Sequence, residues 1–310
     1  MNLSTRFVSM LRCPISGGEV RLDGPGLVNV DGSIVYRVSP SGIPLFAEEF
    51  CTEDARRQQA HFEKIAKKYI ENLGYPHTQE YMSYLDGVFL DVVAHADLSC
   101  AAEICCGSGE AFRLLGEKVQ TGIGVDISMS MLDAARSFLK DDRYCFIQGD
   151  ATNLPLSDNL FSSVFIMGGI HHVNNREKLF GEVFRILKRG GRFYWREPVS
   201  DFFLWRWLRA VIYRFSASLD DKTERPLLFD ETAPVLVKAG LVLKHWETCG
   251  FFGYCVLMNS DVLVFNRLFR YLPAIRYITR AMAKLDDWAV HLPWLKQSGL
   301  IVVGVAEKPE

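Results

Sequence analysis

Several features that mark other protein classes are missing from this sequence of 310 residues. It has no run of eighteen apolar residues, so a membrane-spanning helix is not expected. Its first twelve residues lack the long apolar core of a secretory signal, which makes the cytoplasm the expected location. Neither sign of charge dominates, because 35 Lys and Arg stand against 37 Asp and Glu. The sequence therefore excludes a globally basic surface, and nucleic acid or anionic lipid would need a local patch.

Cysteine is too sparse for a disulfide framework, with eight residues in the whole chain. Cys105 and Cys106 are neighbours in sequence, where a bridge would be geometrically awkward, so we expect reduced thiols. No group of ligands with metal-site spacing accompanies the motifs described below, and no metal is predicted. The 49% of hydrophobic residues is typical of a globular chain with an ample core, and the length predicts about two domains.

A glycine turn, Gly107-Ser-Gly109, stands between an apolar run and a helical pattern. Alone it is weak evidence, because glycine turns also join strands to helices for steric reasons. About twenty residues later Asp126 ends a second apolar run, where dinucleotide-type folds hold ribose hydroxyls. Two further runs end in Gly149-Asp150 and in Gly168. In an open α/β sheet these carboxyl ends of strands form the edge that binds ligands.

Strand-like and helical patterns alternate from residue 101 onward. The expected strands are 101–106, 122–126, 144–148, 163–167, 191–195, 241–248 and 299–306. The expected helices are 110–118, 128–139, 176–187 and 229–239. This alternation predicts an α/β fold in which a parallel sheet carries helices on both faces.

Five motifs occur in one order within this region. They are Glu103-Ile-Cys-Cys-Gly-Ser-Gly, Gly124-Val-Asp-Ile-Ser-x-x-Met-Leu, Gly149-Asp-Ala-x-x-Leu-Pro-Leu-Ser-Asp-Asn-x-Phe, Ile170-His-His-Val and Glu182-Val-Phe-Arg-Ile-Leu-Lys-Arg-Gly-Gly. Together they closely resemble class I S-adenosylmethionine-dependent methyltransferases, in the branch that includes the ubiquinone and menaquinone biosynthesis enzymes. The resemblance covers residues 56–198 well and 229–309 more loosely. It implies a Rossmann-like sheet of seven strands and S-adenosyl-L-methionine as the cofactor.

The same resemblance implies roles for individual residues. Glu103 is expected to meet the methionine amino group, Asp126 to hold the ribose, and Asp150 with Ala151 to read the adenine amino edge. The other implied contacts are Gly107, Ser108 and Gly109 against the ligand backbone, Ile127 and Met131 beside adenine, and Met167 and Gly168 near the sulfur. Two residues depart from the family pattern: Cys105 replaces its first glycine, and Ser162 replaces its common Asp. Cysteine is small, so we expect the first change to be tolerated.

A hydroxyl or phenolic acceptor would benefit from a general base, and imidazole titrates in the useful range. His171 and His172 follow the fourth expected strand at the ligand edge. Adjacent residues at a strand end point in different directions, so we expect one of them to face the acceptor, with His171 as our choice. Glu197, after the fifth strand, is the other candidate base.

Two further segments precede this catalytic region of residues 101–310. Residues 1–48 show short β runs split by Gly and Pro turns, which predicts a small β module. Through Cys13 and the Gly-Ile-Pro at residues 42–44, the module resembles the zinc-ribbon-like domain of methyltransferase activators. Structural zinc takes about four Cys or His ligands, but Ser16 stands where that family has its second cysteine. We therefore predict a degenerate module without metal that packs on or caps the catalytic domain.

Residues 49–100 show a helical pattern and are expected to form a leader that closes the cofactor site. Tyr69 and Tyr81 on this leader have two interpretations that the sequence leaves open. They either pack in the core or touch the methionine end of the cofactor or the substrate.

Two basic amphipathic segments exceed what the fold requires, in helical insertions near residues 200–222 and 251–298. In the segment 202–215 the three arginines, at positions 206, 209 and 214, fall within an arc of roughly 140°. In the second segment Arg276, Arg280 and Lys284 recur every four residues, opposite Ile275, Ile278, Met282 and Leu285. Such helices suit a peripheral membrane contact or a lid over an apolar substrate, although simple core covering remains an equal alternative.

The motifs favour a methyltransferase that acts on a small, apolar or lipid-linked acceptor. An RNA methyltransferase is the first alternative, which would need a continuous basic track, and the net charge of −2 argues against nucleic acid. A partner protein that kept the fold without catalysis is the second alternative. The sequence leaves open the acceptor atom, the pathway and the oligomeric state.

Overall fold

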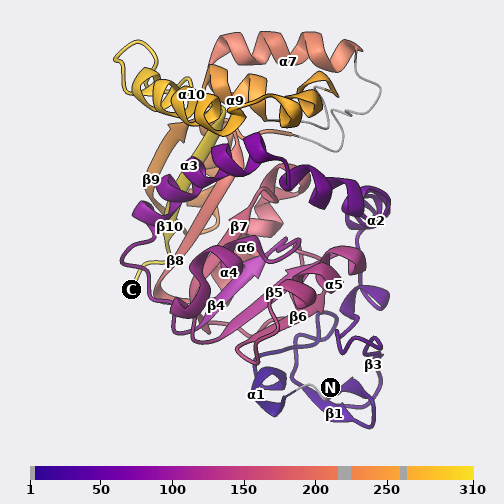
Figure 1. The fold of residues 1–310 in the computed structure, drawn as a ribbon. Coiled ribbons are helices and arrows are strands. Elements are labelled where there is room, and N and C mark those ends of the chain that lie inside the picture. Colours follow the sequence, from indigo (N-terminus) through magenta and orange to yellow (C-terminus); the bar gives the residue numbers. More distant parts are fainter. Residues whose placement is uncertain (1–3, 216–224, 259–263) are drawn as a thin grey trace.

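A mixed seven-stranded sheet forms the centre of the molecule, in the order β6-β5-β4-β7-β8-β10-β9 (Figure 1). The computed structural model describes residues 4–215, 225–258 and 264–310, and leaves out the side chains of residues 209, 211–215 and 264. The strands are β4 (Ala101–Ile104), β5 (Gly122–Asp126), β6 (Tyr144–Gln148), β7 (Phe161–Met167), β8 (Leu187–Pro198), β9 (Val242–Cys249) and β10 (Ile301–Glu307). The predicted α/β fold of seven strands is confirmed.

The strand pairing differs in one respect from a wholly parallel sheet. The neighbours from β6 to β8 pair in parallel, but β10 pairs antiparallel with both β8 and β9. In this register Gly304 lies opposite the fully buried Trp195, and an added Cβ at Gly304 would lie 2.1 Å from the indole. Glycine is therefore required there, because the indole covers the neighbouring strand.

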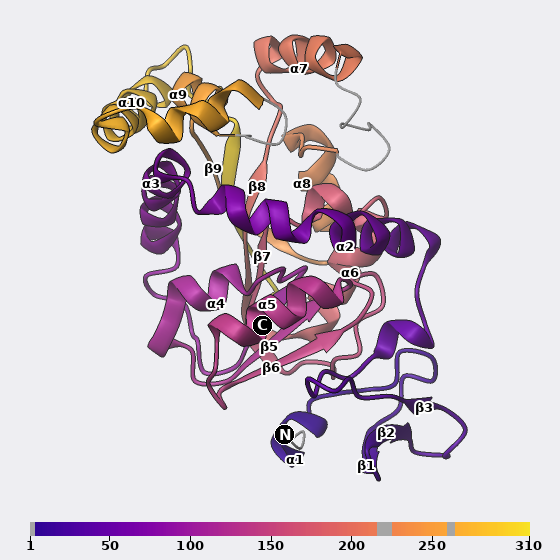
Figure 2. The same ribbon diagram turned by 45° about the vertical axis from the view of Figure 1, so that its right-hand side comes forward.

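Helices cover both faces of the sheet, as the alternation predicts (Figure 2). One face packs on α6 (Arg176–Ile186) and α8 (Phe229–Lys238), through residues such as Phe180 and Leu236. The other packs on α3 (Pro76–Val92), α4 (Glu110–Leu115) and α5 (Met129–Phe138). Residues of β4, β6 and β7 are buried throughout, because strands covered on both faces carry apolar runs instead of an alternating pattern. Short 3₁₀ turns follow α4 at η2 (Gly116–Lys118) and β7 at η3 (Ile170–His172).

The N-terminal residues form a small module beside the β6 edge of the sheet. It holds α1 (Thr5–Val8), β1 (Val20–Asp23), β2 (Gly26–Asn29), β3 (Val35–Tyr36) and η1 (Phe46–Glu48), and its three strands pair antiparallel. Cys13 is buried against the Tyr36 hydroxyl, with 2.9 Å between Sγ and the phenolic oxygen. Among the residues described, no group of three or more His, Cys, Asp or Glu could hold a metal ion. The zinc-ribbon likeness of the module stays a prediction.

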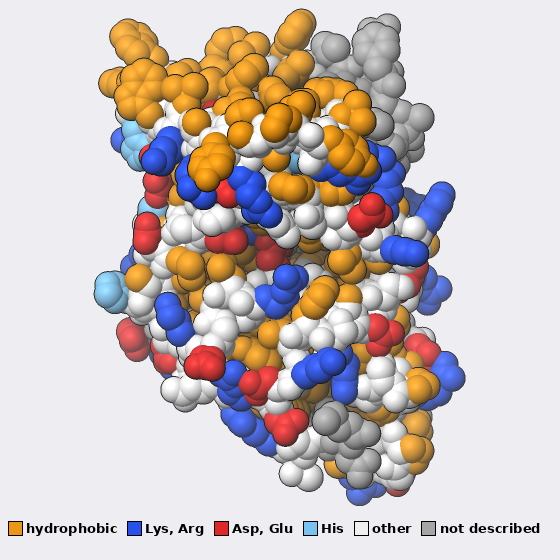
Figure 3. All heavy atoms as spheres, viewed as in Figure 1, with side chains coloured by type: hydrophobic (Ala, Val, Ile, Leu, Met, Phe, Trp, Pro, Cys, Tyr) orange, Lys and Arg blue, Asp and Glu red, His pale blue; other side chains and the backbone are white. Residues whose placement is uncertain are grey.

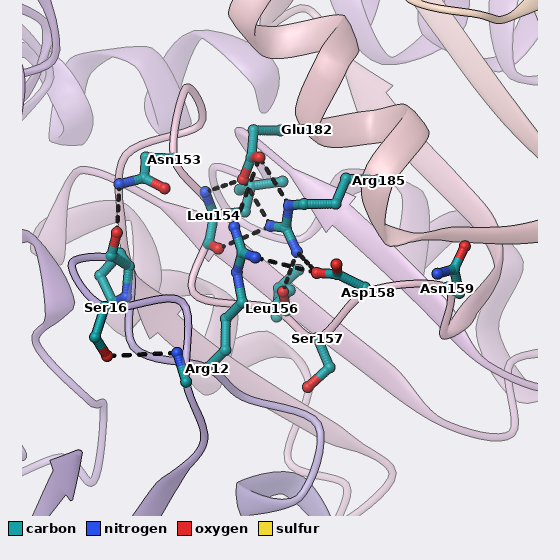
Figure 4. Close-up of polar contacts among 12 residues, drawn as sticks. Arg12, Ser16, Asn153, Leu154, Leu156, Ser157, Asp158, Asn159, Glu182 and Arg185 are labelled. Carbon is teal, nitrogen blue, oxygen red and sulfur yellow. Dashed lines mark hydrogen bonds and ion pairs between the residues drawn. The ribbon is translucent and has the colours of Figure 1, made fainter. Parts of the chain in front are cut away.

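The module docks on the main domain through polar contacts that Figure 4 shows at close range. Arg12 donates to Asp158 across 3.1 Å, and the amide of Asn153 donates to the Pro14 carbonyl across 2.8 Å. Leu45 forms a parallel bridge with Gln148, which extends pairing beyond the β6 edge. Backbone pairing at a sheet edge provides hydrogen-bond partners for N–H and C=O groups of the edge strand that would otherwise be unpaired. The module therefore covers the edge strand next to the cofactor motif that begins at Gly149.

The helical leader consists of two helices rather than one continuous pattern. α2 (Glu53–Leu73) ends at Gly74, and α3 begins with Pro76 in its first turn, where proline is tolerated because its missing amide is unpaired anyway. α2 crosses above the strand ends, and α3 packs on α10 (Ile275–Val290) (Figures 1 and 2).

The two predicted helical insertions meet above the sheet and form one outer layer. The layer contains α7 (Phe203–Phe215), α9 (Phe252–Leu257), η4 (Val264–Tyr271) and α10 (Figure 1). In α10 the predicted apolar side is split, since Ile275 is buried whereas Ile278 and Leu285 are exposed. The side chains of Arg209 and Arg214 lie outside those described, so the predicted basic arc of α7 is untested. No helix of the described segments is long and apolar enough to cross a membrane.

Candidate active site

A cavity of about 730 Å³ lies at the carboxyl ends of the parallel strands, beneath α2. Its volume falls in the range of sites that enclose small molecules and cofactors. The loops after β4, β5, β6 and β7 line it from the sheet side, and α2, α3 and α9 close it from above. Nine of the eleven cofactor residues implied by the resemblance line this one cavity: Gly107, Ser108, Asp126, Ile127, Met131, Asp150, Ala151, Met167 and Gly168.

The glycine turn places backbone amides against an acidic side chain. Gly107 and Gly109 have φ of +50° and +77°, a conformation that glycine adopts without strain. The Gly107 amide donates to Asp126 Oδ2 across 2.8 Å, and the Ser128 amide donates to Oδ1 across 2.9 Å. Each carboxylate oxygen keeps a second lone pair, so Asp126 can still accept both hydroxyls of a vicinal diol.

The backbone conformation of Cys105 explains why the family pattern has glycine at this position. Its φ is +52°, in the left-handed region that costs a residue with Cβ roughly 1–2 kcal/mol. Gly169 faces it so closely that an added Cβ there would lie 2.4 Å from the Cys105 Cβ. The cysteine is thus accommodated by a glycine on the neighbouring loop, and the turn keeps its course.

Asp150 is held by the leader, which the sequence did not indicate. Its Oδ2 accepts bonds from the Thr52 amide (2.9 Å) and the Thr52 hydroxyl (2.6 Å), and its Oδ1 accepts from Thr152. Thr52 is also the N-cap of α2, because its hydroxyl accepts from the Ala55 amide. The residue that starts α2 therefore positions the carboxylate that is expected to read adenine.

Glu103 lies behind the glycine turn instead of on the cavity wall. Its carboxylate is buried, and it accepts from the Ala111 amide at 2.8 Å and the Phe112 amide at 3.2 Å, at the start of α4. Burial raises the pKa of Glu103 to about 8, against the opposing effect of the two amides. Gly109 is likewise absent from the lining. A direct contact of either residue with the cofactor stays a prediction.

His171 and Glu197 form a hydrogen-bonded pair at the cavity edge. His171 Nδ1 lies 2.8 Å from Glu197 Oε2, and Glu197 Oε1 accepts from the amides of Gly169 and Ile170 at 2.6 and 2.8 Å. Glu197 is fully buried and does not line the cavity, and burial raises its pKa to about 7. The two candidate bases are thus one unit, in which Glu197 orients the imidazole that faces the cavity.

His172 lines the same wall and packs between other rings. Its centroid lies 3.9 Å from that of His171 and 5.1 Å from that of Phe62, which belongs to α2. The contact with Phe62 ties the loop after β7 to the leader.

An ion cluster around the buried Arg196 also lines the cavity. The Arg196 guanidinium donates to Asp86 across 2.7 Å and also contacts Glu110, so three elements meet there. Arg196 is buried, whereas both acids remain partly exposed toward the cavity. The neighbouring lining is apolar, from Met82 and Tyr254. The cavity therefore has a polar floor along the strand ends and an apolar part beneath the outer layer.

The two tyrosines of the leader lie in different environments. Tyr69 lines the cavity, whereas Tyr81 is fully buried and donates to Asp286 of α10. Sequence reasoning missed Thr52, Asp86, Glu110 and Arg196. A threonine three residues before Ala55 at a helix start was a usable N-cap signal, but nothing in the sequence connects Arg196 with α3.

Comparisons with known proteins agree with this architecture. Residues 102–195 match the model of the methyltransferase domain family. A 2-phytyl-1,4-beta-naphthoquinone methyltransferase of Arabidopsis thaliana is 40% identical over 29% of this chain and 38% of its own length. A demethylmenaquinone methyltransferase of Staphylococcus saprophyticus is 32% identical over 44% of this chain and 61% of its own length. The chain thus spans less than two thirds of these two relatives.

Solved structures show the same fold at low sequence identity. A chain of the complex between the Haloferax volcanii Trm112 methyltransferase activator and a candidate methyltransferase has a TM-score of 0.55 at 20% identity. The alignment covers 81% of this chain and 97% of that chain. An S-adenosylmethionine-dependent methyltransferase of Thermotoga maritima has a TM-score of 0.53 at 21% identity, over 80% and 98% of the two chains. These structures show that the chain has the fold of such methyltransferases, and within that fold residues 102–195 match the methyltransferase domain family.

Proposed function

We propose that this chain transfers a methyl group from S-adenosyl-L-methionine to a small, apolar or lipid-linked acceptor. The observation that carries the proposal is the assembly of nine of the implied cofactor residues on one cavity that continues into an apolar part near Met82 and Tyr254. The relatives named above are methyltransferases of quinone precursors, which are lipid-linked small molecules. Neither the RNA enzyme nor the non-catalytic partner gains support from these relatives.

Cofactor binding would place the adenosine along the strand ends. Asp126 would accept the ribose hydroxyls, Asp150 and Ala151 would meet the adenine edge, and Met131 would pack on the base. The sulfonium donor is already activated when it binds. The protein therefore contributes mainly by aligning the acceptor, the methyl group and the sulfur, and such alignment can supply a large part of the rate enhancement.

The His171–Glu197 pair would supply the base for an acceptor that must lose a proton. When Glu197 is ionised, its carboxylate would accept from His171 Nδ1, and Nε2 of the neutral imidazole would then take the proton of the acceptor. The ionised Glu197 carboxylate would then stabilise the imidazolium that forms. His172 would shape the loop through its contact with Phe62 instead of taking the proton.

The place of action follows from the acceptor class. We extend the proposal to an enzyme of the cytoplasm that contacts a membrane surface peripherally through the α7 and α10 segments, since lipid-linked acceptors reside in bilayers.

Two measurements test the proposed function in order. Calorimetric titration with S-adenosylmethionine and with its demethylated product should give micromolar dissociation constants. Transfer of labelled methyl from the cofactor to a demethylmenaquinol in detergent micelles should then be lost in His171→Ala while cofactor binding remains. Absence of binding for both ligands would overturn the proposal and favour a partner protein. Binding without transfer would restrict the failure to the choice of acceptor.

A further inference from the structure

The outer layer presents aromatic side chains to solvent on one face. Figure 3 shows hydrophobic side chains gathered across the top of the molecule, over α9, α10 and the described part of α7. The most exposed of them are 64–92% accessible: Phe203, Trp207, Leu268, Tyr271, Tyr277 and Trp294. We call these six residues and their exposed neighbours in α7, η4, α10 and the following loop the aromatic face.

The aromatic face is not a by-product of core packing. On α10, Tyr277, Leu285 and Trp288 fall within about 80° of one another at 100° per residue, so they form one outward stripe. Ile275 and Ala283 are buried and form the inward side of the same helix. Contiguous exposed apolar surface beyond a few hundred Å² marks an interaction site, and Trp and Tyr favour the interface of a bilayer.

Charge around the aromatic face differs from that of the rest of the chain. Residues 264–298 contain six Lys and Arg against two Asp, whereas the whole chain has 35 against 37 acidic residues. One of those two acids, Asp286, is buried and accepts from the amides of Phe251, Gly253 and Tyr254. Figure 3 shows Lys and Arg bordering the apolar area from below. An apolar centre with a basic border complements an anionic lipid surface.

The basic border can accept lipid phosphates beside its present partners. Arg276 and Arg280 reach Glu80 of α3 at 3.9 and 2.7 Å, and both arginine side chains are more than half exposed. The Glu80 side chain is only 12% exposed, so it holds the inner side of the two guanidinium groups while their outer side faces solvent. Lipid phosphates that approach the border would therefore bind the exposed side of the arginines without displacing Glu80.

The same layer separates the aromatic face from the apolar part of the cavity by a single helix. In α9, Phe252 is exposed, whereas Tyr254 lines the cavity. Trp205 of α7 is buried beside Phe251, at 5.3 Å between centroids, and its indole donates to the Ser298 carbonyl. An apolar molecule that leaves a bilayer beneath this face would thus meet the cavity after crossing one layer of side chains.

We propose that the aromatic face docks on an anionic lipid bilayer and that the methyl acceptor enters the cavity from that bilayer. The docking stands on the face itself, whereas the entry of the acceptor rests on the proposed function. A second copy of this chain is the competing occupant of the face. A symmetric pair would bring Arg276, Arg280 and Lys284 of one copy toward those of the other, and like charges at an interface oppose association.

Vesicle co-sedimentation of the full chain without cofactor tests the docking. The probes are phosphatidylcholine vesicles with and without phosphatidylglycerol. We expect binding to the anionic vesicles that falls about tenfold in the double variant Tyr277→Ser, Trp294→Ser, because two interfacial aromatics are lost. The matched control is Val30→Ser, Val35→Ser, which removes similarly exposed apolar side chains from the N-terminal module. Lys284→Glu should weaken binding to anionic vesicles more than binding to neutral ones.

Other results of the vesicle experiment would overturn the docking. The docking is contradicted if the wild-type chain binds neither kind of vesicle, or if the control variant loses as much vesicle binding as Tyr277→Ser, Trp294→Ser. A dimer in light scattering that Tyr277→Ser, Trp294→Ser converts to a monomer, without vesicle binding, assigns the face to a second copy. Cofactor titration of the same variants separates the two proposals. Retained vesicle binding with no cofactor binding would overturn the proposed methyl transfer alone, whereas retained cofactor binding with no vesicle binding would overturn the docking and the proposed membrane contact but not the methyl transfer.

Discussion

At the carboxyl ends of β4 to β8 acidic side chains are buried or half-buried and matched by backbone amides, whereas in the outer layer aromatic side chains face solvent. Asp126, Asp150 and Glu197 each accept at least two amide or hydroxyl hydrogens. Trp294 and Tyr277, by contrast, have most of their surface uncovered. This difference indicates that the strand ends are arranged to bind a ligand inside the cavity, whereas the outer layer is arranged to contact a surface outside the molecule. Substitutions in the two regions should therefore separate cofactor binding from lipid binding.

The largest effect is expected at Asp126. Asp126→Ala removes the acceptor of the Gly107 amide together with the expected partner of the ribose, and should weaken S-adenosylmethionine binding about 100-fold. Calorimetry measures it, with Asp133→Ala on the outer side of α5 as control, because Asp133 accepts only from Ser41 of the module among the contacts described. A wild-type affinity in Asp126→Ala would remove the strand ends from the cofactor site.

The next effect is expected in the rate and its pH dependence. Burial raises the pKa of Glu197 to about 7, so the carboxylate that orients His171 forms only as the pH rises through that value. The wild-type rate should fall below about pH 7, and Glu197→Gln should lower kcat on the order of 100-fold and abolish this limb. Cofactor affinity should stay unchanged, since Glu197 does not line the cavity. A pH profile that Glu197→Gln leaves intact would assign the limb to another group.

A smaller effect is expected where the leader meets the cofactor site. Thr52→Ala removes the N-cap of α2 and one of the two bonds that Thr52 makes to Asp150, so cofactor affinity should fall about three- to tenfold. Thr52→Ser keeps the hydroxyl and serves as the control in the same titration. Equal affinities for the alanine and serine variants would show that α2 does not position Asp150.

The smallest effect is expected in the outer layer. Leu268→Ser and Tyr271→Ser change exposed side chains of η4, so the free energy of unfolding should change by less than about 0.5 kcal/mol. Denaturant titration and calorimetry should show wild-type stability and wild-type cofactor affinity. A large loss of either would show that these side chains support the cavity, and the contrast between the two regions would fail.

Much of the fold followed from local pattern. The pattern of short apolar runs predicted the buried strands β4 to β7, and amphipathic periodicity predicted the helices that follow β4, β5 and β7, because neighbouring residues largely decide these features. The antiparallel direction of β10 could not be predicted from the sequence pattern, since it depends on where the chain re-enters the sheet after the long insertion. The split of α10 between buried Ile275 and exposed Leu285 also escaped the pattern, because both are apolar.

The amino-acid sequence by itself determined the methyltransferase motifs and their order, and the family resemblance implied eleven cofactor residues, nine of which line one cavity. These nine come together because the carboxyl ends of neighbouring parallel strands meet at one edge of the sheet. Only the tertiary structure decided that Glu197 and His171 form a hydrogen-bonded pair, that Thr52 holds Asp150 and that Arg196 pairs with Asp86. These partners come from elements far apart in the chain, and their approach depends on packing that no local pattern records.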